Sequence, residues 1–258
     1  MFDNFALFWY NNLSLKTEEI MDDPALLDED EDDREVANDP YPNFIFVRHA
    51  QSRGNLLTQA ERAKLEVGTI YYELTPLGVT QAQRTGAWLH CYCSDPDRIF
   101  RSYFMRTRRT ADLLYPDRQI DEDERLAEAN RGIWHVLNED EIQERMPWEI
   151  KRRELDGLYH YRPPGGENWP DVELRLRDFR RSMRRRFPGK TIVVVTHGNW
   201  LLLWQKRIHH WTIDETVERY RQGRIVENAS VLIYRDELVR GKHRLVEDSY
   251  IVPWQGKL

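Results

Sequence analysis

Two short apolar runs, each followed closely by a histidine, constrain the fold of this chain more than any other feature. The first run, NFIFV over residues 43–47, is followed by Arg48 and then His49. The second, TIVVV over residues 191–195, is followed by a threonine and then His197. Runs of this length and composition are typical of strands buried on both faces of a sheet. Because ligands bind beyond the carboxyl ends of parallel strands, we expect both histidines at one cleft.

Helical signals lie between and after these two runs. Thr75 followed by Pro76 predicts the N-cap and first residue of a helix that runs towards Trp88. A further helix is predicted over about 170–186, where apolar residues recur at helical spacing at Val172, Leu176, Phe179 and Met183. Strands that alternate with helices indicate an α/β fold, a three-layer sandwich with a mostly parallel central sheet.

Three more helices complete the expected pattern. Residues 106–115 form a helical segment that Pro116 stops. Asn138, three residues ahead of a glutamate, resembles a capping box for a helix that Pro147 interrupts or ends. The apolar run over 200–204 begins another helix directly after the second histidine motif. We find no internal repeat.

Charge divides the chain into two parts. Residues 1–42 carry thirteen Asp or Glu against two basic residues, whereas the remaining chain is mildly basic and suits an anionic ligand. The acidic run over 28–33 repels itself and lacks apolar partners. We therefore expect an acidic N-terminal segment over 1–42, partly disordered or docked, and a folded domain over 43–258. The apolar cluster in the first ten residues would dock on the body or on a partner.

Cysteine content and hydropathy bear on the compartment. Cys91 and Cys93 are the chain's two cysteines, and they lie too close together for an ordinary disulfide, which favours a reducing environment. The apolar N-terminus has no basic residue ahead of it and no small-residue cleavage site. No run approaches the length of a membrane span. We expect a cytoplasmic protein that has no membrane partner.

The residues around His49 resemble a known signature. RHAQSRGN over 48–55 is similar to the RHGxSxxN motif of the histidine phosphatase superfamily, with Ala50 where glycine is more common. Further matches follow in the family's order at 74–82, 102–111, 126–134, 164–168 (PGGEN), 195–198 (VTHG) and 228–230. The resemblance covers residues 43–235. It implies a phosphoglycerate mutase-like fold and a histidine phosphatase-like catalytic domain over 43–258.

The residue types in these motifs suit phosphoryl transfer. Charge on the transferring group spreads over its oxygens, so catalysis relies on cationic and N–H groups that face them. Arg48 and Arg106 can each bind two oxygens. Asn55 offers amide donors, and the N–H of Gly198 at a helix start is a natural anion contact. His49 fits the nucleophile, because neighbouring arginines disfavour a protonated ring.

Two roles follow from the resemblance alone. It implies that His197 stabilises the phosphoryl group, and that Glu128 protonates the leaving group and later takes a proton from water. Because the family's acid varies in position, Asp121, Glu122, Asp123 and Glu124 remain alternatives to Glu128. Ser52 either caps the helix that follows it or contacts the phosphate. We expect no metal site and no cofactor, since the adjacent His209 and His210 point in different directions on a helix.

Hydrolysis is the favoured reaction. Mutases of this superfamily resemble one another in an FTGWxD-type insert after the first motif, and residues 56–73 do not show it. Residues 139–171 are closer to the phosphatase branches. The prediction is a phosphatase that hydrolyses phosphomonoesters through a phosphohistidine on His49. The alternatives are a phosphoglycerate mutase-type phosphotransferase and a non-catalytic phosphate-binding scaffold.

The expected partner is a small phosphorylated substrate, whose identity depends on cleft walls that the motifs do not specify. Seven arginines between 175 and 186 make one predicted helix strongly basic, and nucleic acid has to be considered. A solvated face, or a dock for the acidic segment, is the favoured interpretation over nucleic-acid binding. The sequence carries no prediction of the oligomeric state.

Overall fold

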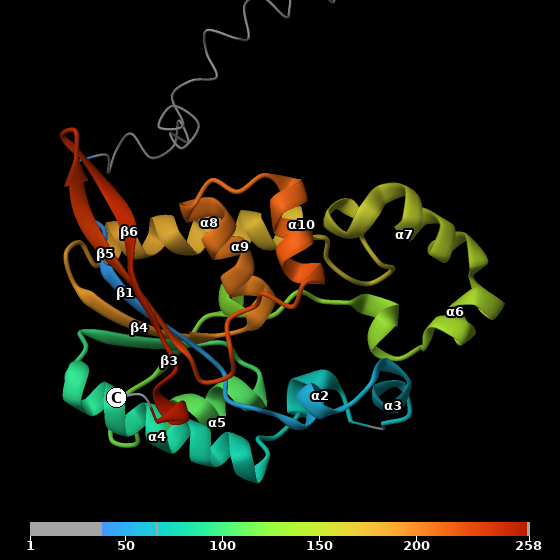
Figure 1. The fold of residues 1–258 in the computed structure, drawn as a ribbon, viewed down its shortest axis with the longest axis horizontal. Coiled ribbons are helices and arrows are strands. Elements are labelled where there is room, and N and C mark those ends of the chain that lie inside the picture. The colour runs from blue at the N-terminus through green and yellow to red at the C-terminus, as the bar shows by residue number, and fades with distance from the viewer. Residues whose placement is uncertain (1–37, 66, 257–258) are drawn as a thin grey trace, which may run out of the picture. The chain divides into compact units, whose positions relative to one another are not determined.

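A six-stranded sheet forms the centre of the structure, a computed structural model that describes residues 38–65 and 67–256 (Figure 1). The strand order is β3-β2-β4-β1-β5-β6. The strands are β1 (Asn43–Arg48), β2 (Arg98–Arg101), β3 (Asp121–Glu122), β4 (Thr191–Thr196), β5 (Val231–Val239) and β6 (Lys242–Ile251). The first four strands of this order pair in parallel. β5 pairs antiparallel with β1, and β6 pairs antiparallel with β5. The mostly parallel sheet is confirmed.

The helices predicted from the sequence are present, with bounds that differ by a few residues, and further helices accompany them. They are α2 (Arg53–Leu56), α3 (Gln59–Ala63), α4 (Pro76–Tyr92), α5 (Met105–Leu114), α6 (Glu139–Arg145), α7 (Pro147–His160), α8 (Trp169–Arg186), α9 (Gly198–Ile208) and α10 (Ile213–Arg221). The Thr75 side chain caps α4 by accepting a hydrogen bond from Gly78 N at 3.0 Å. Pro147 ends the α6 segment by opening a new helix, as its fixed φ and missing N–H suit a first helical position.

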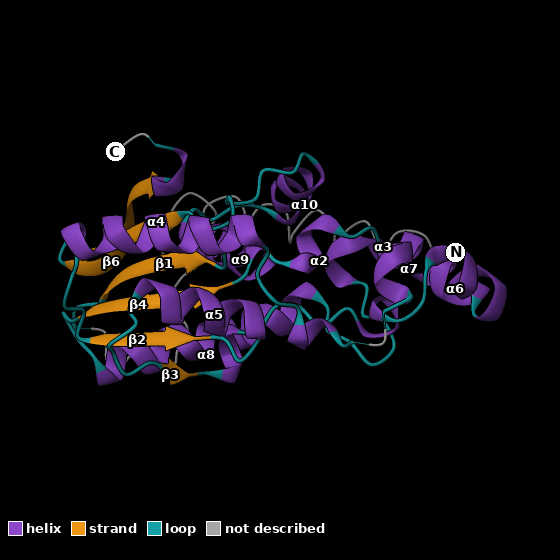
Figure 2. Ribbon diagram, turned by 90° about the horizontal axis from the view of Figure 1, so that it is seen from below, coloured by secondary structure: helices purple, strands orange, loops and turns teal. Residues whose placement is uncertain are grey.

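Helices cover both faces of the sheet, which confirms the three-layer sandwich (Figure 2). On one face, Phe44 and Phe46 of β1 pack with Trp204 of α9 and with the apolar side of α8. On the other face, Ile45 and Val47 pack with residues of α4 and α5. The alternation of side chains along β1 therefore supplies both cores from one strand.

The register of β1 against β4 sets the position of the two histidines. The strands pair in parallel from Asn43 with Thr191 to Arg48 with Thr196, the last residue of each strand. His49 N donates to Thr196 O at 2.9 Å. His49 and His197 thus follow immediately at the same edge of the sheet, as predicted.

Two arginines of α8 are buried, in contrast to the solvated face that was expected for this helix. Arg180 and Arg184 are each only 4% exposed. The Arg184 guanidinium lies 3.9 Å from the ring centre of Tyr41, and its Nε donates to Asp39 O at 2.9 Å. Their aliphatic stems pack on the body while the charged ends find carbonyl and aromatic partners, which a charge count along a helix does not reveal. That part of the helix is structural.

The predicted acidic segment over 1–42 lies almost wholly outside the described residues, so its boundary stays a prediction. The described chain belongs to one compact unit from Asp39 onward. Both Cys91 and Cys93 are free thiols. None of the helices in residues 38–65 and 67–256 has the length and apolar character that crossing a membrane requires.

Candidate active site

A cavity of about 150 Å³ opens at the carboxyl edge of the sheet. Five of the residues predicted from the sequence line it: Arg48, His49, Asn55, Arg106 and Glu128. They come from the end of β1, from α2, from α5 and from the loop after the short 3₁₀ helix η4 (Glu124–Leu126). Residues up to 80 positions apart in sequence therefore meet in one pocket.

Two helices hold the loop that carries His49. Ala50 N donates to Thr110 Oγ1 on α5 at 3.0 Å, and Gln51 N donates to Gln81 Oε1 on α4 at 2.9 Å. Helix α4 approaches so closely that a Cβ at Gly78 would lie 2.0 Å from the carbonyl oxygen of Gln51. The side chain of the nucleophile candidate is consequently carried on a backbone fixed from two sides.

Hydrogen bonding assigns the tautomer of His49. Nδ1 lies 2.8 Å from the carbonyl oxygen of Ala50, which can only accept, so Nδ1 carries the proton. Nε2 accepts from Arg106 Nε at 3.1 Å. Burial, followed by the charges of Arg106 and Arg48, holds the pKa of His49 well below its ordinary value. The ring is neutral, and His49 lines the cavity with its unprotonated Nε2 held by Arg106.

Arg48 and Arg106 supply positive charge on either side of this ring. Arg106 is 8% exposed, and burial lowers its pKa to about 10, so it remains a cation at neutral pH. Its Nη1 donates to Thr69 O at 3.0 Å, while Arg48 Nη1 donates to Val226 O at 2.5 Å. Arg48 Nε is buried and has no hydrogen-bond partner among the described residues. An oxygen of an anionic ligand would satisfy that donor.

His197 lies behind His49 rather than in the cavity wall. The two ring centres are 5.2 Å apart, and His197 Nε2 lies 2.9 Å from Ser102 Oγ. Its Nδ1 is buried without a hydrogen-bond partner in the described chain. Burial, with Arg106 and His49 adding to it, lowers the pKa of His197 well below its ordinary value. Nδ1 of this neutral ring can bind a phosphoryl oxygen only in the tautomer in which it carries the proton, so the predicted role of His197 in stabilising the phosphoryl group stays a prediction.

Gly198 begins α9 and lies against Arg48. A Cβ at this position would lie 3.3 Å from Cζ of Arg48 and 3.0 Å from a side-chain carbon of Ile225. Any larger residue would therefore displace the arginine. Gly198 does not line the cavity itself, and its predicted phosphate contact stays a prediction.

Asn55 and Ser52 are joined in one capping arrangement. Asn55 Oδ1 accepts from Ser52 N at 2.9 Å and from Ser52 Oγ at 3.1 Å. The oxygen of the amide is thus engaged, which leaves the Nδ2 donor of Asn55 to the cavity that it lines. Ser52 also lines the cavity, so it caps the helix and borders the site at the same time.

Glu128 is the acidic residue that the cavity contains, whereas Asp121 to Glu124 do not line it. Glu128 Oε1 accepts from Ala129 N at 3.0 Å, and Oε2 accepts from Asn199 N at 3.3 Å, in the first turn of α9. Glu122 instead binds Arg101 and Arg108, and Asp123 binds Arg125. Among the alternatives left open by the sequence, the structure favours Glu128.

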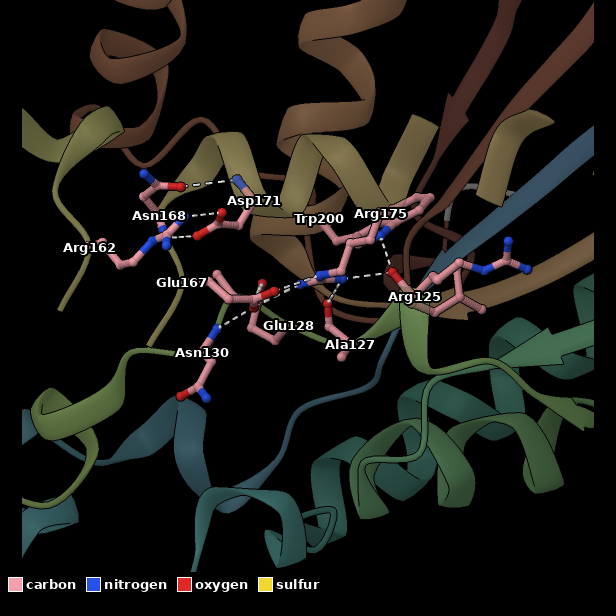
Figure 3. Close-up of polar contacts among 12 residues, drawn as sticks. Arg125, Ala127, Glu128, Asn130, Arg162, Glu167, Asn168, Asp171, Arg175 and Trp200 are labelled. Carbon is pink, nitrogen blue, oxygen red and sulfur yellow. Dashed lines mark hydrogen bonds and ion pairs between the residues drawn. The ribbon is translucent and has the colours of Figure 1, made fainter. Parts of the chain in front are cut away.

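A partly buried polar network supports the segment that carries Glu128 (Figure 3). Arg175 Nη1 donates to the carbonyl oxygens of Arg125 and Ala127, both at 2.7 Å. The same guanidinium pairs with Glu167, whose Oε2 accepts from Asn130 N at 2.9 Å. One arginine on α8 and one glutamate of the PGGEN motif therefore hold both ends of the segment 125–130.

The outer wall of the cavity contains residues that the sequence did not single out. They are Arg62, Tyr72, Arg131, His135 and Asn199. Arg131 N donates to His135 Nε2 at 3.1 Å, and burial together with nearby arginines lowers the pKa of His135 to about 4. None of these residues ends a strand, and of the five only Arg131 lies within a matched segment, 126–134. Within the described residues, no cluster of three His, Cys, Asp or Glu side chains could hold a metal ion.

Comparison with known proteins assigns the class. The family model for the histidine phosphatase superfamily, branch 1, matches residues 44–246, and the chain belongs to that superfamily. Among curated relatives, a 2,3-bisphosphoglycerate-dependent phosphoglycerate mutase of Methylorubrum extorquens (strain PA1) is 31% identical over 166 residues, or 61% of this chain and 74% of that protein. The protein of the same description from Methylocella silvestris is 31% identical over 213 residues, or 78% of this chain and 97% of that protein.

Solved structures show the same fold. YhfR of Bacillus stearothermophilus superposes with a TM-score of 0.63 at 25% identity, covering 80% of this chain and 96% of that one. The alpha-ribazole phosphatase of Shigella flexneri superposes with a TM-score of 0.61 at 19% identity, covering 80% and 95%. The superfamily is catalytic, and its named members near this chain include both mutases and phosphatases.

Proposed function

We propose that this protein is a phosphatase that hydrolyses phosphomonoesters through a covalent phosphohistidine on His49. The observation that carries the proposal is the state of that ring: Nδ1 is locked to a carbonyl, and Nε2 has an unprotonated lone pair beside two arginines. A buried neutral imidazole in a cationic pocket suits attack on phosphorus.

The proposed reaction has two steps. His49 Nε2 bonds to phosphorus as the ester P–O bond breaks, and the departing alkoxide takes a proton from the Glu128 carboxyl group. A water molecule then gives a proton to the Glu128 carboxylate and attacks the phosphorus. The P–N bond breaks, and inorganic phosphate leaves. Arg48 and Arg106 would stabilise the charge on the phosphoryl oxygens in both steps.

A phosphoglycerate mutase is the second candidate, because the curated relatives at 31% identity carry that description. Mutase and phosphatase share the first step and differ in the acceptor of the phosphoryl group. The absence of an FTGWxD-type insert over residues 56–73 supports water as the acceptor.

The direct test is to trap the intermediate. We expect brief mixing with a phosphomonoester, followed by a neutral or alkaline denaturing quench, to leave phosphate on His49, which mass spectrometry of peptides would locate. His49→Ala should carry no label and show no turnover, and the exposed His160→Ala should behave as the unchanged protein. Label on a serine or aspartate, or turnover without label under several quenches, would overturn the mechanism.

A second assay separates the two reactions. The protein is incubated with 3-phosphoglycerate and 2,3-bisphosphoglycerate, and both phosphate release and conversion to 2-phosphoglycerate are measured. Hydrolysis predicts that phosphate release from a preferred ester is faster than isomer conversion. Faster conversion would make the protein a mutase. If the protein binds phosphate but hydrolyses no phosphate ester, the result would instead support a non-catalytic phosphate-binding scaffold.

A further inference from the structure

A second cavity adjoins the phosphate pocket. It has a volume of about 110 Å³, and it shares Ala129, Arg131 and Asn199 with the pocket that contains His49. Its walls come from η5 (Gly132–His135), α7, α8 and α10. Helix α7 contacts both α8 and α10, and it lies to one side of the sheet, at the right in Figure 1. A molecule with its phosphate at His49 would extend into this second cavity, which we call the ring cavity.

Four aromatic side chains line the ring cavity. Its lining includes Trp134, Tyr161, Trp169 and Tyr220. The first three are at most 7% exposed, so they are fixed by packing rather than free to turn outward. Trp169 and Tyr220 meet edge to face, with ring centres 5.4 Å apart. A substrate ring beside them could pack edge to face or offset-stacked in turn, the arrangements that aromatic pairs favour.

The polar groups of two of these rings are already satisfied. Trp134 Nε1 donates to the Tyr161 hydroxyl at 3.1 Å, and that hydroxyl lies 3.1 Å from Oε2 of the buried Glu149. Trp134 and Tyr161 therefore contribute apolar ring surface to the cavity. Glu167 also borders it, but Arg175 and Asn130 N engage its carboxylate.

Two arginines complete the wall. Arg153 lies 4.5 Å from the ring centre of Trp134, a cation–π contact. Arg131, at the junction of the two cavities, pairs with no carboxylate in the described chain. A small sugar acid would leave the aromatic walls uncovered. A substrate with a flat ring would cover them, and Arg131 would then face the polar part of the substrate that joins its ring to its phosphate. A cavity of this size is on the scale of one aromatic ring.

We propose that the substrate is a phosphomonoester whose alcohol part carries an aromatic or heteroaromatic ring, which lies in the ring cavity while the phosphate lies at His49. This proposal rests on the phosphatase function proposed above. The ring contacts would lower the energy of the bound substrate and its transition state together. The structure thus assigns the choice of substrate to η5, α7 and α10 rather than to the phosphate motifs.

Matched esters test the proposal. We expect kcat/KM for 2-phenylethyl phosphate to exceed that for n-propyl phosphate by about 10-fold or more, as for filling an apolar pocket. Both are primary alkyl esters with leaving groups of similar basicity, so the difference isolates the ring. Tyr220→Ala should lose most of this preference, measured as the ratio of the two kcat/KM values within the same variant. Tyr220→Phe should keep the preference, and so should Tyr92→Ala, which lines neither cavity.

Binding of phosphonates, which cannot be hydrolysed, separates this proposal from the phosphatase function. Calorimetry should show tighter binding of 3-phenylpropylphosphonate than of n-butylphosphonate, with the preference lost in Tyr220→Ala. Equal binding and equal kcat/KM in an active enzyme would overturn the ring proposal alone. Ring-dependent binding without turnover would support it and overturn hydrolysis.

Discussion

Arg106 Nε donates a hydrogen bond to His49 Nε2 across 3.1 Å, so the cation holds the nitrogen that would attack phosphorus. Burial and this contact keep the ring neutral, because a proton on Nε2 would lack solvation and face a guanidinium. When a phosphoryl group enters, the same N–H can turn to one of its oxygens. The pair therefore links the state of the nucleophile to the charge that stabilises the reaction.

Removal of the Arg106 cation should lower the rate of the reaction far more than it lowers the stability of the fold. We expect Arg106→Ala to lower kcat by roughly 10²-fold or more, as for loss of one preorganised charged contact. Arg106→Lys should recover only part, because an ammonium group cannot bind two oxygens in a fork. Steady-state kinetics and thermal unfolding measure the two effects, with the exposed Arg109→Ala on the same helix as control. A decrease in kcat of less than 3-fold in Arg106→Ala would indicate that the phosphate binds elsewhere.

Comparison of leaving groups tests the role of Glu128. Glu128→Gln cannot protonate the departing oxygen, so hydrolysis of alkyl phosphates should fall severely, by about 10²-fold or more. An aryl phosphate should suffer less in the first step, because a phenolate leaves without a proton, and phosphoenzyme should accumulate. Rapid-quench kinetics on both esters measures this difference. Glu124→Gln, outside the cavity, is the matched control, and equal losses on both esters would reduce Glu128 to a pocket-shaping role.

Arg175 should act through Glu128 without contacting substrate. Arg175→Ala removes the donors that hold Arg125 O and Ala127 O, so the segment with the carboxyl group should shift. We expect a loss in kcat of about 10-fold, larger for alkyl than for aryl phosphates, since misplacement of a catalytic group is costly. Arg185→Ala on the same helix is the control. A loss that is the same for both esters would indicate a general structural effect.

Stability should fall on the acid side of pH 6.5, partly through His135. Its folded-state pKa of about 4 lies below the unfolded value of about 6.5, so the unfolded chain binds a proton more readily. The free energy of unfolding therefore decreases as pH falls from about 6.5 towards 4. In His135→Gln this decrease should be smaller, as urea unfolding at pH 7 and pH 4.5 would measure. The exposed His160→Gln should match the unchanged protein, and an unaltered pH dependence in His135→Gln would contradict the assignment.

The local sequence was sufficient to predict the strands and helix starts that position the site. The apolar runs ahead of His49 and His197 specify strands through side-chain packing alone, and parallel pairing then brings their ends together. Thr75 and Asn138 act within one helical turn, so their capping roles follow from spacing. The RHAQSRGN motif contains both the N-cap of α2 and residues of the site. Asn55 and Ser52 could therefore be predicted from the sequence without knowledge of the fold.

Other features depend on contacts between distant segments. Glu128 stands out from its acidic neighbours only because its segment runs past α8 and α9, where Arg175 and Asn199 hold it beside the cavity. The arginines of α8 carry the same charge in sequence, yet packing buries Arg180 and Arg184 and leaves others exposed. The ring cavity is lined by residues from η5, α7, α8, α9 and α10 and from the loops ahead of η5 and α8, which lie far apart in the sequence. Motifs record chemistry within a few residues, whereas substrate-facing walls form from packing across the whole chain, and only the tertiary structure decides them.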